Sequence, residues 1–301
     1  MIKTLQILLF CGIIFAGDFM PKNIIFEKDN YYYSHCTMIP SYKDFKLHTH
    51  NGYEVYIYLG GDAEYIIESK TFPMAPYDIF VTKNDELHQV RHITKTKYER
   101  IVIQFGDDFL EENNCISYCK ALKYRNSDTD NMISPTSKER MNIIDCVSRI
   151  EKYIADSTEF SDTIVKCTII ELLHIINTIK SDKVNVKRNN NISAIIDYIN
   201  NNLSSDIKLD DIANHMFMSK YHICRIFKNY TGITINKYIT GMRLKCVQKL
   251  YSEGHSLSSA CELAGFSSYS NFYKAYYSET GKSPKKDIEN YNLFNDIELQ
   301  E

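Results

Sequence analysis

The chain has 301 residues, of which 44% are hydrophobic and 24% charged, with only 11 glycines and 6 prolines. This composition excludes collagen-like, low-complexity and intrinsically disordered proteins, and the length predicts two domains of ordinary size. The net charge of −3 does not indicate a polybasic protein, and nine cysteines without a CxxC pair predict reduced thiols rather than disulfides or a zinc site.

Residues 1–19 resemble a secretory signal peptide, because an almost wholly apolar run extends from Ile2 to Ala16 with a single Lys3 at its start. The run is too short to span a bilayer comfortably. The alternative is that translation begins at Met20. We expect residues 1–19 to be dispensable and the protein to be cytoplasmic, because nothing downstream suits an exported protein.

Residues 20–135 have the pattern of a β domain. Short aromatic and β-branched runs, among them residues 53–58 and 101–103, are separated by turn residues such as Gly60 and Gly61. Many short strands joined by frequent turns predict a small barrel or jelly roll.

A histidine-rich segment in this domain resembles the first cupin motif. It contains His48, His50 and Glu54, and His88 stands where the second cupin motif places its histidine, although the glycines of that second motif are absent. In a strand, His48 and His50 point to the same face. The four side chains would then offer a metal ion three nitrogens and one oxygen.

Residues 136–180 are predicted to form helices, because apolar residues recur there at helical spacing. The helix around residues 164–179 is apolar around much of its circumference, so it must be buried against the β domain or against a second subunit. We expect a homodimer formed through this segment. The polar, aperiodic residues 181–191 predict a linker.

Residues 192–290 are predicted to form an all-α domain, followed by an acidic tail at residues 291–301. Between residues 189 and 286 there are 12 Lys and Arg against 7 Asp and Glu, a net of +5, as expected where one domain contacts phosphate. Two similar units, each a short helix, a turn and a second helix, flank a long helix of about 18 residues and about 27 Å. That length would hold two DNA-reading helices near one DNA turn, about 34 Å, apart.

The second helix of each unit combines an apolar inner face with a polar outer face. In the first unit Ser219 is the expected N-cap, and Ile223 and Phe227 point inward. A helix that is packed on one side and carries hydrogen-bond donors on the other suits the DNA major groove. The outward residues are Tyr221, Cys224, Arg225 and Lys228 in the first unit and Ser270, Asn271 and Lys274 in the second.

The all-α domain resembles the DNA-binding domain of the AraC/XylS family of bacterial transcription regulators. The resemblance covers residues 192–286 and implies two helix-turn-helix units with both recognition helices on one face of the DNA. The residues that carry it are Leu209, Ala213, Ser219, Ile223, Arg225, Phe227-Lys228, Thr231-Gly232, Tyr238-Ile239, Arg243-Leu244, Ala260, Ala264-Gly265-Phe266, Ser268, Phe272, Gly281 and Ser283-Pro284.

The resemblance implies roles for the outward residues. Those of the second unit would face bases, as would Tyr221, Cys224 and Arg225 in the first unit, whereas Lys228 is a candidate for phosphate contact. Cys224 is equally compatible with a space-filling role. The chain also departs from the family in having Tyr276-Tyr277 where Phe-Lys is usual.

The resemblance implies a regulator, more often an activator than a repressor, that binds double-stranded DNA and responds to a small-molecule effector, with a sugar as the expected class. An activator would also contact RNA polymerase. In this family a cupin-shaped domain usually forms the effector pocket, which His48, His50, Glu54, Tyr56 and His88 would line. The alternative is a metal-binding cupin sensor or enzyme fused to a DNA-binding domain. No nucleotide-binding glycine loop or catalytic Ser-His-Asp order is present, so we expect neither enzymatic activity nor a cofactor.

Overall fold

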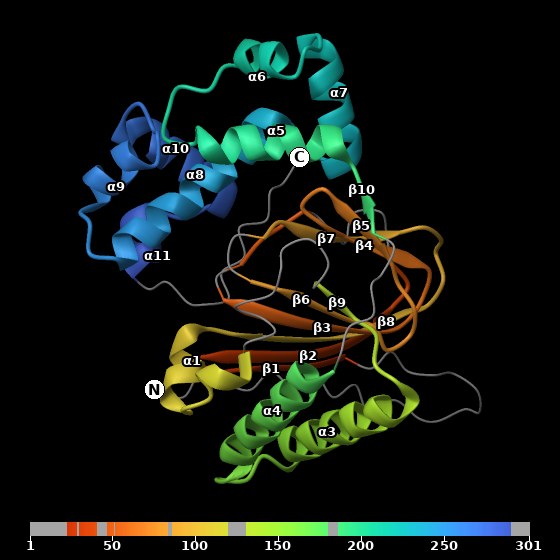
Figure 1. Ribbon diagram of the computed structural model, residues 1–301. Helices are drawn as coiled ribbons and strands as arrows, with labels where there is room; N and C mark the ends of the chain where they lie inside the picture. The colour runs from red at the N-terminus through yellow and green to blue at the C-terminus, as the bar shows by residue number, and fades with distance from the viewer. Residues whose placement is uncertain are drawn as a thin grey trace.

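The computed structural model describes residues 23–28, 30–40, 47–50, 52–83, 86–119, 131–179 and 186–289. Figure 1 shows an N-terminal half built on β-sheets, with two long helices on one side and an all-helical C-terminal half on the other. The predicted leader and the predicted acidic tail lie outside the described residues. Among the residues described, no helix is long and apolar enough to cross a membrane.

The N-terminal half contains two antiparallel sheets, with strand orders β1-β2-β8-β3-β6-β9 and β10-β5-β4-β7. The strands are β1 (Asn23–Glu27), β2 (Tyr31–Met38), β3 (Tyr53–Gly60), β4 (Ala63–Ile67), β5 (Lys70–Pro73), β6 (Ile79–Thr82), β7 (His88–His92), β8 (Tyr98–Phe105), β9 (Met132–Ile133) and β10 (Lys187–Arg188). The described strands form two separate sheets, and the isolated bridge between His48 and His88 of β7 adds only a segment outside the named strands. The expected closed barrel is therefore not found. The chain passes between the sheets at turns such as the one after Gly60, where the pairing register of β3 also shifts, so the ladder is interrupted there.

Helices α3 (Ser137–Asp156) and α4 (Ser161–Thr178) cover the outer face of the six-stranded sheet, while α1 (Asp107–Glu112) and the 3-10 turn η1 (Ile116–Cys119) lie beside it. Thr136 and Glu139 form a capping box that starts α3. The inner residues of α4 are buried against the sheet and α3. Burial of each of these apolar side chains stabilises the fold by about 1.5–3 kcal/mol. These residues are Val165, Ile169, Leu172, Leu173 and Ile176.

The apolar surface of α4 is thus buried within one chain. Of the two alternatives that the sequence left open, the helix packs against the β domain and does not need a second subunit to cover it. What stays exposed on these helices is smaller: Met141 at 71%, Ile144 at 45% and Phe160 at 68% exposure.

The C-terminal half consists of seven helices among the described residues. They are α5 (Asn190–Asn201), α6 (Leu209–His215), α7 (Lys220–Thr231), α8 (Ile235–Ser252), α9 (Leu257–Leu263), α10 (Tyr269–Thr280) and α11 (Pro284–Glu289). Ser219 and Ser268 accept hydrogen bonds from the backbone and begin α7 and α10. Both helices end at a left-handed glycine, Gly232 and Gly281. These caps explain where both helices begin and end, and Ser219 is the N-cap that the sequence predicts.

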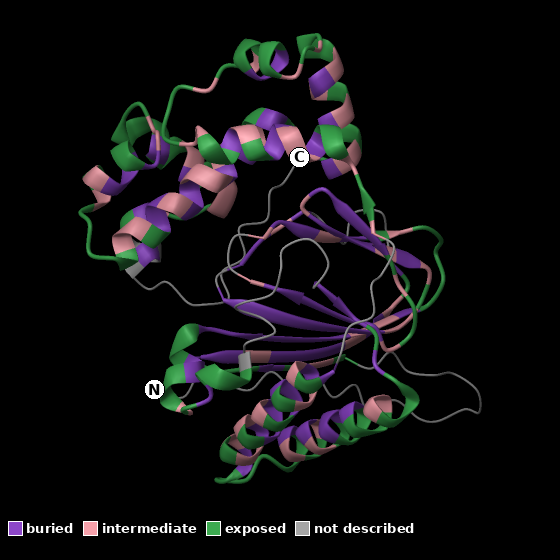
Figure 2. Cartoon of the chain, viewed as in Figure 1, coloured by how far each residue is buried: buried purple, intermediate pink, exposed green. Residues whose placement is uncertain are grey.

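The two halves are in direct contact, and Figure 2 colours most of the strands that lie nearest the helical half as buried. Residues Lys187 and Arg188, in the predicted linker, form β10 and pair with β5, and the Asn189 N–H donates to the Ser69 carbonyl at 2.9 Å. Asn189 also caps α5, which begins two residues before its predicted start. The sequence missed this strand because strand addition at a sheet edge uses backbone groups and requires no apolar pattern.

Candidate DNA interface and ligand site

The outer face of α7 presents three of the four predicted residues to solvent. Tyr221 is 77% exposed, and Arg225 and Lys228 are also exposed. The Arg225 guanidinium lies 6.0 Å from the centre of the Tyr221 ring and 3.4 Å from Nδ1 of His222. Cys224 is half-buried and packs against the core of the helical half, so the structure favours its space-filling role.

The outer face of α10 exposes Ser270, Asn271 and Lys274, while Phe272 and Tyr276 are buried beneath them. The Asn271 amide donates to the Ser267 hydroxyl at 2.8 Å, which orients it along the helix N-terminus.

Three tyrosines next to this face were not predicted from the sequence. Tyr269, Tyr273 and Tyr277 are 42%, 39% and 55% exposed, and the rings of the last two are parallel at 6.4 Å. Their spacing of four residues is the signal that could have revealed them as one stripe.

The loop after α5 fixes the two helix pairs relative to each other. From α8, Arg243 donates to the backbone carbonyls of Leu203 at 3.0 Å and Ser205 at 2.6 Å. Gly265, in the turn between α9 and α10, lies so close to this loop that a Cβ atom there would be 2.4 Å from the Leu203 carbonyl oxygen. The same loop therefore positions α8 and the second helix pair.

The four residues of the cupin-like motif come together at one end of the space between the sheets. Nε2 of His50 lies 3.3 Å and Nε2 of His88 3.6 Å from the Glu54 carboxylate. The rings of His48 and His50 lie 4.4 and 4.9 Å from that of His88, centre to centre. The sequence prediction that these side chains face one another is thus met in the geometry.

The carboxylate of Glu54 is held by donors from neighbouring strands. The Tyr65 hydroxyl donates to it at 2.9 Å and the Gln104 amide at 3.0 Å. Two hydrogen bonds of this kind favour the charged form of a carboxylate. Glu54 is only 3% exposed, and although burial raises the pKa of its carboxyl, the neighbouring His88, His50 and His48 outweigh this and hold the pKa well below its usual range.

The buried imidazole of His88 suits a neutral, ligand-binding state. Burial, together with the neighbouring His48, holds the pKa of His88 well below its usual range. Nδ1 of His88 lies 2.8 Å from the Glu86 carbonyl, which directs Nε2 toward Glu54. Both ring nitrogens of His50 are buried without a hydrogen bond, because its 3.3 Å approach to Glu54 is poorly aligned.

This donor set fits a metal ion. One ligand atom from each of His48, Glu54 and His88 lies within 4.8 Å of the others. Neutral imidazoles and one carboxylate are the ligands of borderline transition metals such as zinc and iron. The unpaired nitrogen atoms of the site are equally able to bind hydroxyl groups of an organic ligand.

A further polar residue reaches into the same interior. Tyr56 is 1% exposed, its hydroxyl is buried without a hydrogen bond, and its ring lies 4.8 Å from that of Tyr65, edge to face. A buried hydroxyl without a partner costs about 1–3 kcal/mol and indicates a missing polar ligand or water.

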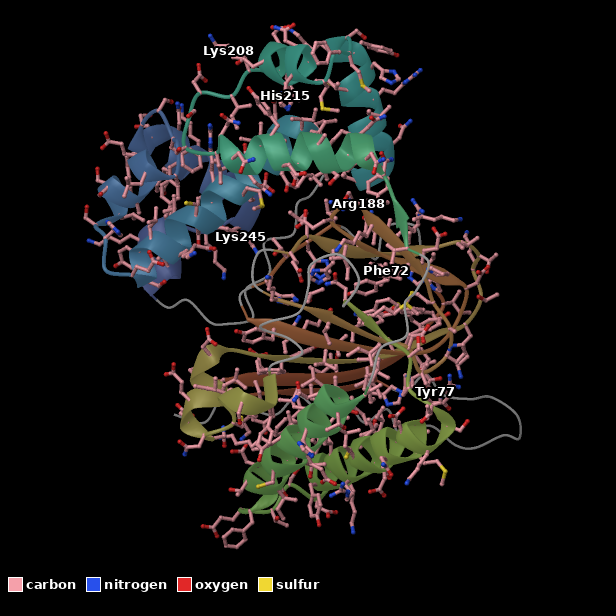
Figure 3. The ribbon with its side chains drawn as sticks, viewed as in Figure 1. Phe72, Tyr77, Arg188, Lys208, His215 and Lys245 are labelled. Carbon is pink, nitrogen blue, oxygen red and sulfur yellow. The ribbon has the colours of Figure 1, made fainter. Side chains whose placement is uncertain are left out.

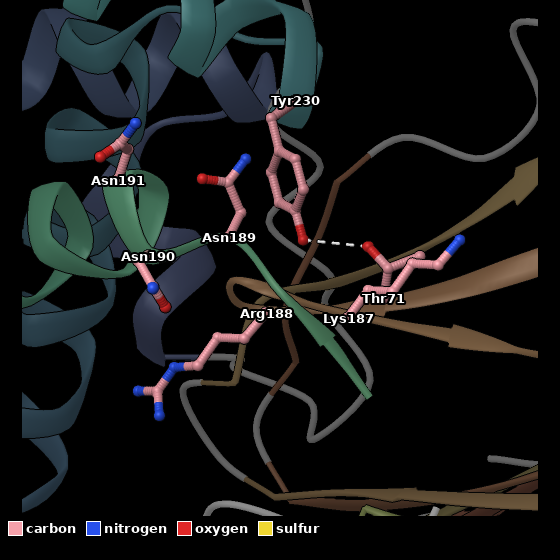
Figure 4. A pocket seen from close by; sticks show the side chains of 7 residues that line it. All are labelled: Thr71, Lys187, Arg188, Asn189, Asn190, Asn191 and Tyr230. Carbon is pink, nitrogen blue, oxygen red and sulfur yellow. Dashed lines mark hydrogen bonds between the residues drawn. The ribbon is translucent and has the colours of Figure 1, made fainter. Parts of the chain in front are cut away.

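A separate pocket of about 520 Å³ lies where the two halves meet (Figure 4). It is lined by both halves, and the Tyr230 hydroxyl at the end of α7 lies 3.2 Å from that of Thr71 in β5. This pocket could not be predicted from the sequence, because its walls come from distant segments. Its remaining walls are Lys187, Arg188, Asn189, Asn190 and Asn191.

The chain resembles known regulators in both halves. Residues 212–289 match the family described as "Helix-turn-helix domain". The "Uncharacterized HTH-type transcriptional regulator YfiF" of Bacillus subtilis is 21% identical over 86% of this chain and 83% of that protein. The "Probable transcription factor PqrA" of Proteus vulgaris is 34% identical over 28% of this chain and 70% of that protein. The "Melibiose operon regulatory protein" of Escherichia coli is 29% identical over 32% of each chain.

Similarity to solved structures is weaker. ToxT of Vibrio cholerae covers 85% of this chain at 13% identity with a TM-score of 0.35. The DNA-binding domain of AdpA in complex with a target DNA covers 32% at 19% identity with a TM-score of 0.31. Scores of this size do not establish a common fold. The regulators matched in sequence, together with the two capped helix pairs, show that the chain belongs to the AraC/XylS family of transcription regulators.

Proposed function

We propose that the protein is a sequence-specific DNA-binding transcription regulator with two helix-turn-helix units, α6–α7 and α9–α10. The observation that carries the proposal is the arrangement of α7 and α10, each with a buried apolar face and an exposed polar face. Arg225, Asn271 and Lys274 supply donors for base edges, and Lys228 supplies a charge for phosphate. Helix α8, with 18 residues and a length of about 27 Å, separates the units by nearly one DNA turn.

The experiment that tests this proposal is the selection of bound sequences from random double-stranded DNA by the full chain. A sequence-specific regulator enriches one motif with two half-contacts about one helical turn apart. Enrichment of no motif would contradict the proposal. Repeating the selection with a panel of sugars and other metabolites would reveal an effector through a changed yield or motif.

The N-terminal half is proposed to be a cupin-like sensor, with His48, His50, Glu54, Tyr56 and His88 as its effector site. Support comes from the buried, unpaired polar atoms of His50 and Tyr56, which suit a ligand rich in hydroxyl groups. One relative, the melibiose regulator of Escherichia coli, is named for a sugar operon. A sugar is therefore the first class to test.

A metal-binding sensor is the second candidate, favoured by the close approach of His48, Glu54 and His88. Such an ion would supply positive charge and a Lewis acid at the end of the β-sandwich. Measuring the metal content of the purified chain distinguishes the metal-sensor hypothesis from the effector-pocket hypothesis. A stoichiometric transition metal that is lost in Glu54→Gln supports the metal sensor, and a metal-free chain that binds a sugar supports the effector pocket.

The remaining assignments follow from the same proposal. The domains are taken as residues 20–135 for the sensor, 136–180 for dimerisation, 181–191 for the linker and 192–290 for DNA binding. An activator role agrees with a relative named as a transcriptional activator, AarP of Providencia stuartii. Contact with RNA polymerase, a homodimer, a cytoplasmic location and the absence of enzymatic activity belong to the same proposal.

A further inference from the structure

The segment that carries the sensor histidines is also part of the core of the helical half. Leu47 and Leu87, 3% and 1% exposed, precede His48 and His88 and belong to the same apolar cluster as the helices α5 to α11. The backbones of His48 and His88 exchange two hydrogen bonds, of 3.1 and 3.0 Å. A displacement of either histidine must therefore also displace Leu47 or Leu87, which pack in the core of the helical half.

One charged residue of the helical half enters the sensor at this point. Lys245 of α8 is 4% exposed, and its ammonium group donates to the Thr49 hydroxyl and, at 3.4 Å, to the His50 carbonyl. Figure 3 labels Lys245 on the side of the helical half that faces the sheets. A buried ammonium is tolerated only when acceptors replace its water, and here the sensor supplies them.

The docked arrangement leaves the proposed DNA-reading residues open. Tyr221, Arg225 and Lys274 are exposed to solvent, so docking does not cover them. It does restrain their orientation, because Lys245 holds α8 while Tyr230 at the end of α7 contacts Thr71. To bind both half-contacts of a site, the DNA-binding half must adopt one orientation relative to the DNA. If it must first leave the docked position to do so, its apparent affinity for DNA is lower.

We propose that Lys245 is a latch residue: its contact with Thr49 and His50 holds the DNA-binding half in a restrained orientation and transmits occupancy of the histidine site to DNA binding. This inference rests on the proposed function of the two halves and adds the route between them. A ligand that moves His50 acts directly on an acceptor of Lys245. The helix that spaces the two DNA-reading units is thereby the element that senses the ligand.

The test compares Lys245→Met with Lys249→Met in the full chain. Both substitutions remove one positive charge from α8, but Lys249 is exposed. On a duplex that carries the selected site with its two half-contacts, loss of charge alone weakens binding or leaves it unchanged. Release of a latch does the opposite, so Lys245→Met is expected to bind about tenfold more tightly than wild type, whereas Lys249→Met is not. Equal or weaker binding by Lys245→Met would overturn the latch.

A second variant keeps the test valid if Lys245→Met folds poorly. Thr49→Val removes an acceptor from the sensor side and leaves the helical half unchanged. It should also tighten DNA binding, and the double variant should gain little beyond Lys245→Met, because both act on one contact. Independent, additive effects would contradict the proposal.

Hydrogen exchange separates the latch from the proposed function. In both variants, peptides that contain Leu47–His50 and Leu87–His88 should exchange about tenfold faster, since an undocked interface exposes their amides. Wild-type protein that binds no DNA would remove the proposed function, and the exchange comparison alone would then decide the latch. Unchanged exchange in both variants would overturn it.

Discussion

Arg225 is the residue whose substitution most directly tests how the chain reads DNA. Its guanidinium lies on the exposed face of α7, where it can donate two parallel hydrogen bonds to a guanine edge. Arg225→Ala should cost about 1–3 kcal/mol on the selected site and relax the preference at one base pair. Lys228→Ala should instead weaken binding similarly on every sequence and reduce the salt slope by about one.

Equilibrium binding at several salt concentrations, on the selected site and on single-base variants, distinguishes the two effects. Folding is checked by thermal unfolding, because Phe227 between them is a core residue. A folded Arg225→Ala protein with unchanged affinity and selectivity would mean that another face of α7 contacts DNA.

Glu68 gives the interface a dependence on pH. Burial raises the pKa of its carboxyl to about 7, with help from the negative charge of Glu86, while the Leu87 N–H, Lys245 and Lys70 oppose the shift. One carboxylate oxygen, Oε2, is buried without a hydrogen bond. Between the ordinary pKa of 4.5 and about 7, the folded chain keeps a proton that the unfolded chain has lost.

The unfolding free energy should therefore fall as pH rises through this window, and the contribution of the protonated carboxyl should be complete below pH 4.5. Glu68→Gln keeps the acceptor for Leu87 but cannot ionise. Its stability relative to wild type should rise from pH 5 to pH 8 by at most about 3 kcal/mol. Urea unfolding at four pH values measures this, and a difference that does not vary with pH would contradict the assignment.

At the scale of elements, the turn between α9 and α10 depends on a glycine for two reasons. Gly265 has a φ of +87°, and an added Cβ would be 2.4 Å from the Leu203 carbonyl oxygen. Gly232 has a similar φ of +81° but open space around it. Gly232→Ala should cost about 1–2 kcal/mol, the price of a left-handed residue, and Gly265→Ala distinctly more.

Thermal unfolding of the two alanine variants compares these costs directly. The additional loss of stability in Gly265→Ala, relative to Gly232→Ala, measures how tightly the second helix pair packs against the loop after α5. Equal losses would show that the loop yields, and that Arg243 alone holds the two pairs in place.

The sequence predicts elements well where a local signal determines them. Ser219, Ser268, Gly232 and Gly281 fix the ends of α7 and α10 through side-chain caps and left-handed backbone, and both signals can be read from neighbouring residues. The approach of His48 to Glu54 and His88 was also predictable, because the motif specifies their spacing, although His48 and His50 lie outside the named strands and not in a strand as expected.

Other features could not be predicted because distant segments create them. The two-sheet arrangement differs from a closed barrel only in which strand edges pair. The sequence of a single strand does not specify its partner. Lys245 looks like any surface lysine on a helix, and its burial depends on Thr49, far away in the chain. The same holds for β10, whose pairing uses only backbone groups.

At the scale of the whole molecule, the exposed apolar residues of α3 are the remaining candidates for a dimer surface. Met141 and Ile144 lie one turn apart and are 71% and 45% exposed. If the chain is a homodimer through these helices, Ile144→Glu should shift it to monomers in sedimentation equilibrium at micromolar concentration. Ile25→Glu, on β1 at a position that is 65% exposed, should not.

A monomeric wild type would contradict this prediction. A dimer that both substitutions leave intact would place the dimer surface elsewhere.

Strand β10 has a consequence for the spacing of operator half-sites. While Lys187 and Arg188 stay paired with β5 and the Asn189 N–H stays bonded to Ser69, the start of the DNA-binding half is held against the sensor. If the two residues detach, the roughly ten residues between α4 and α5 could span about 30 Å. With β10 paired, the protein would bind operators with one fixed spacing between half-sites. Binding to operators with variable spacing would require β10 to separate from β5. Inserting base pairs between half-sites would therefore report directly on the state of a strand only two residues long.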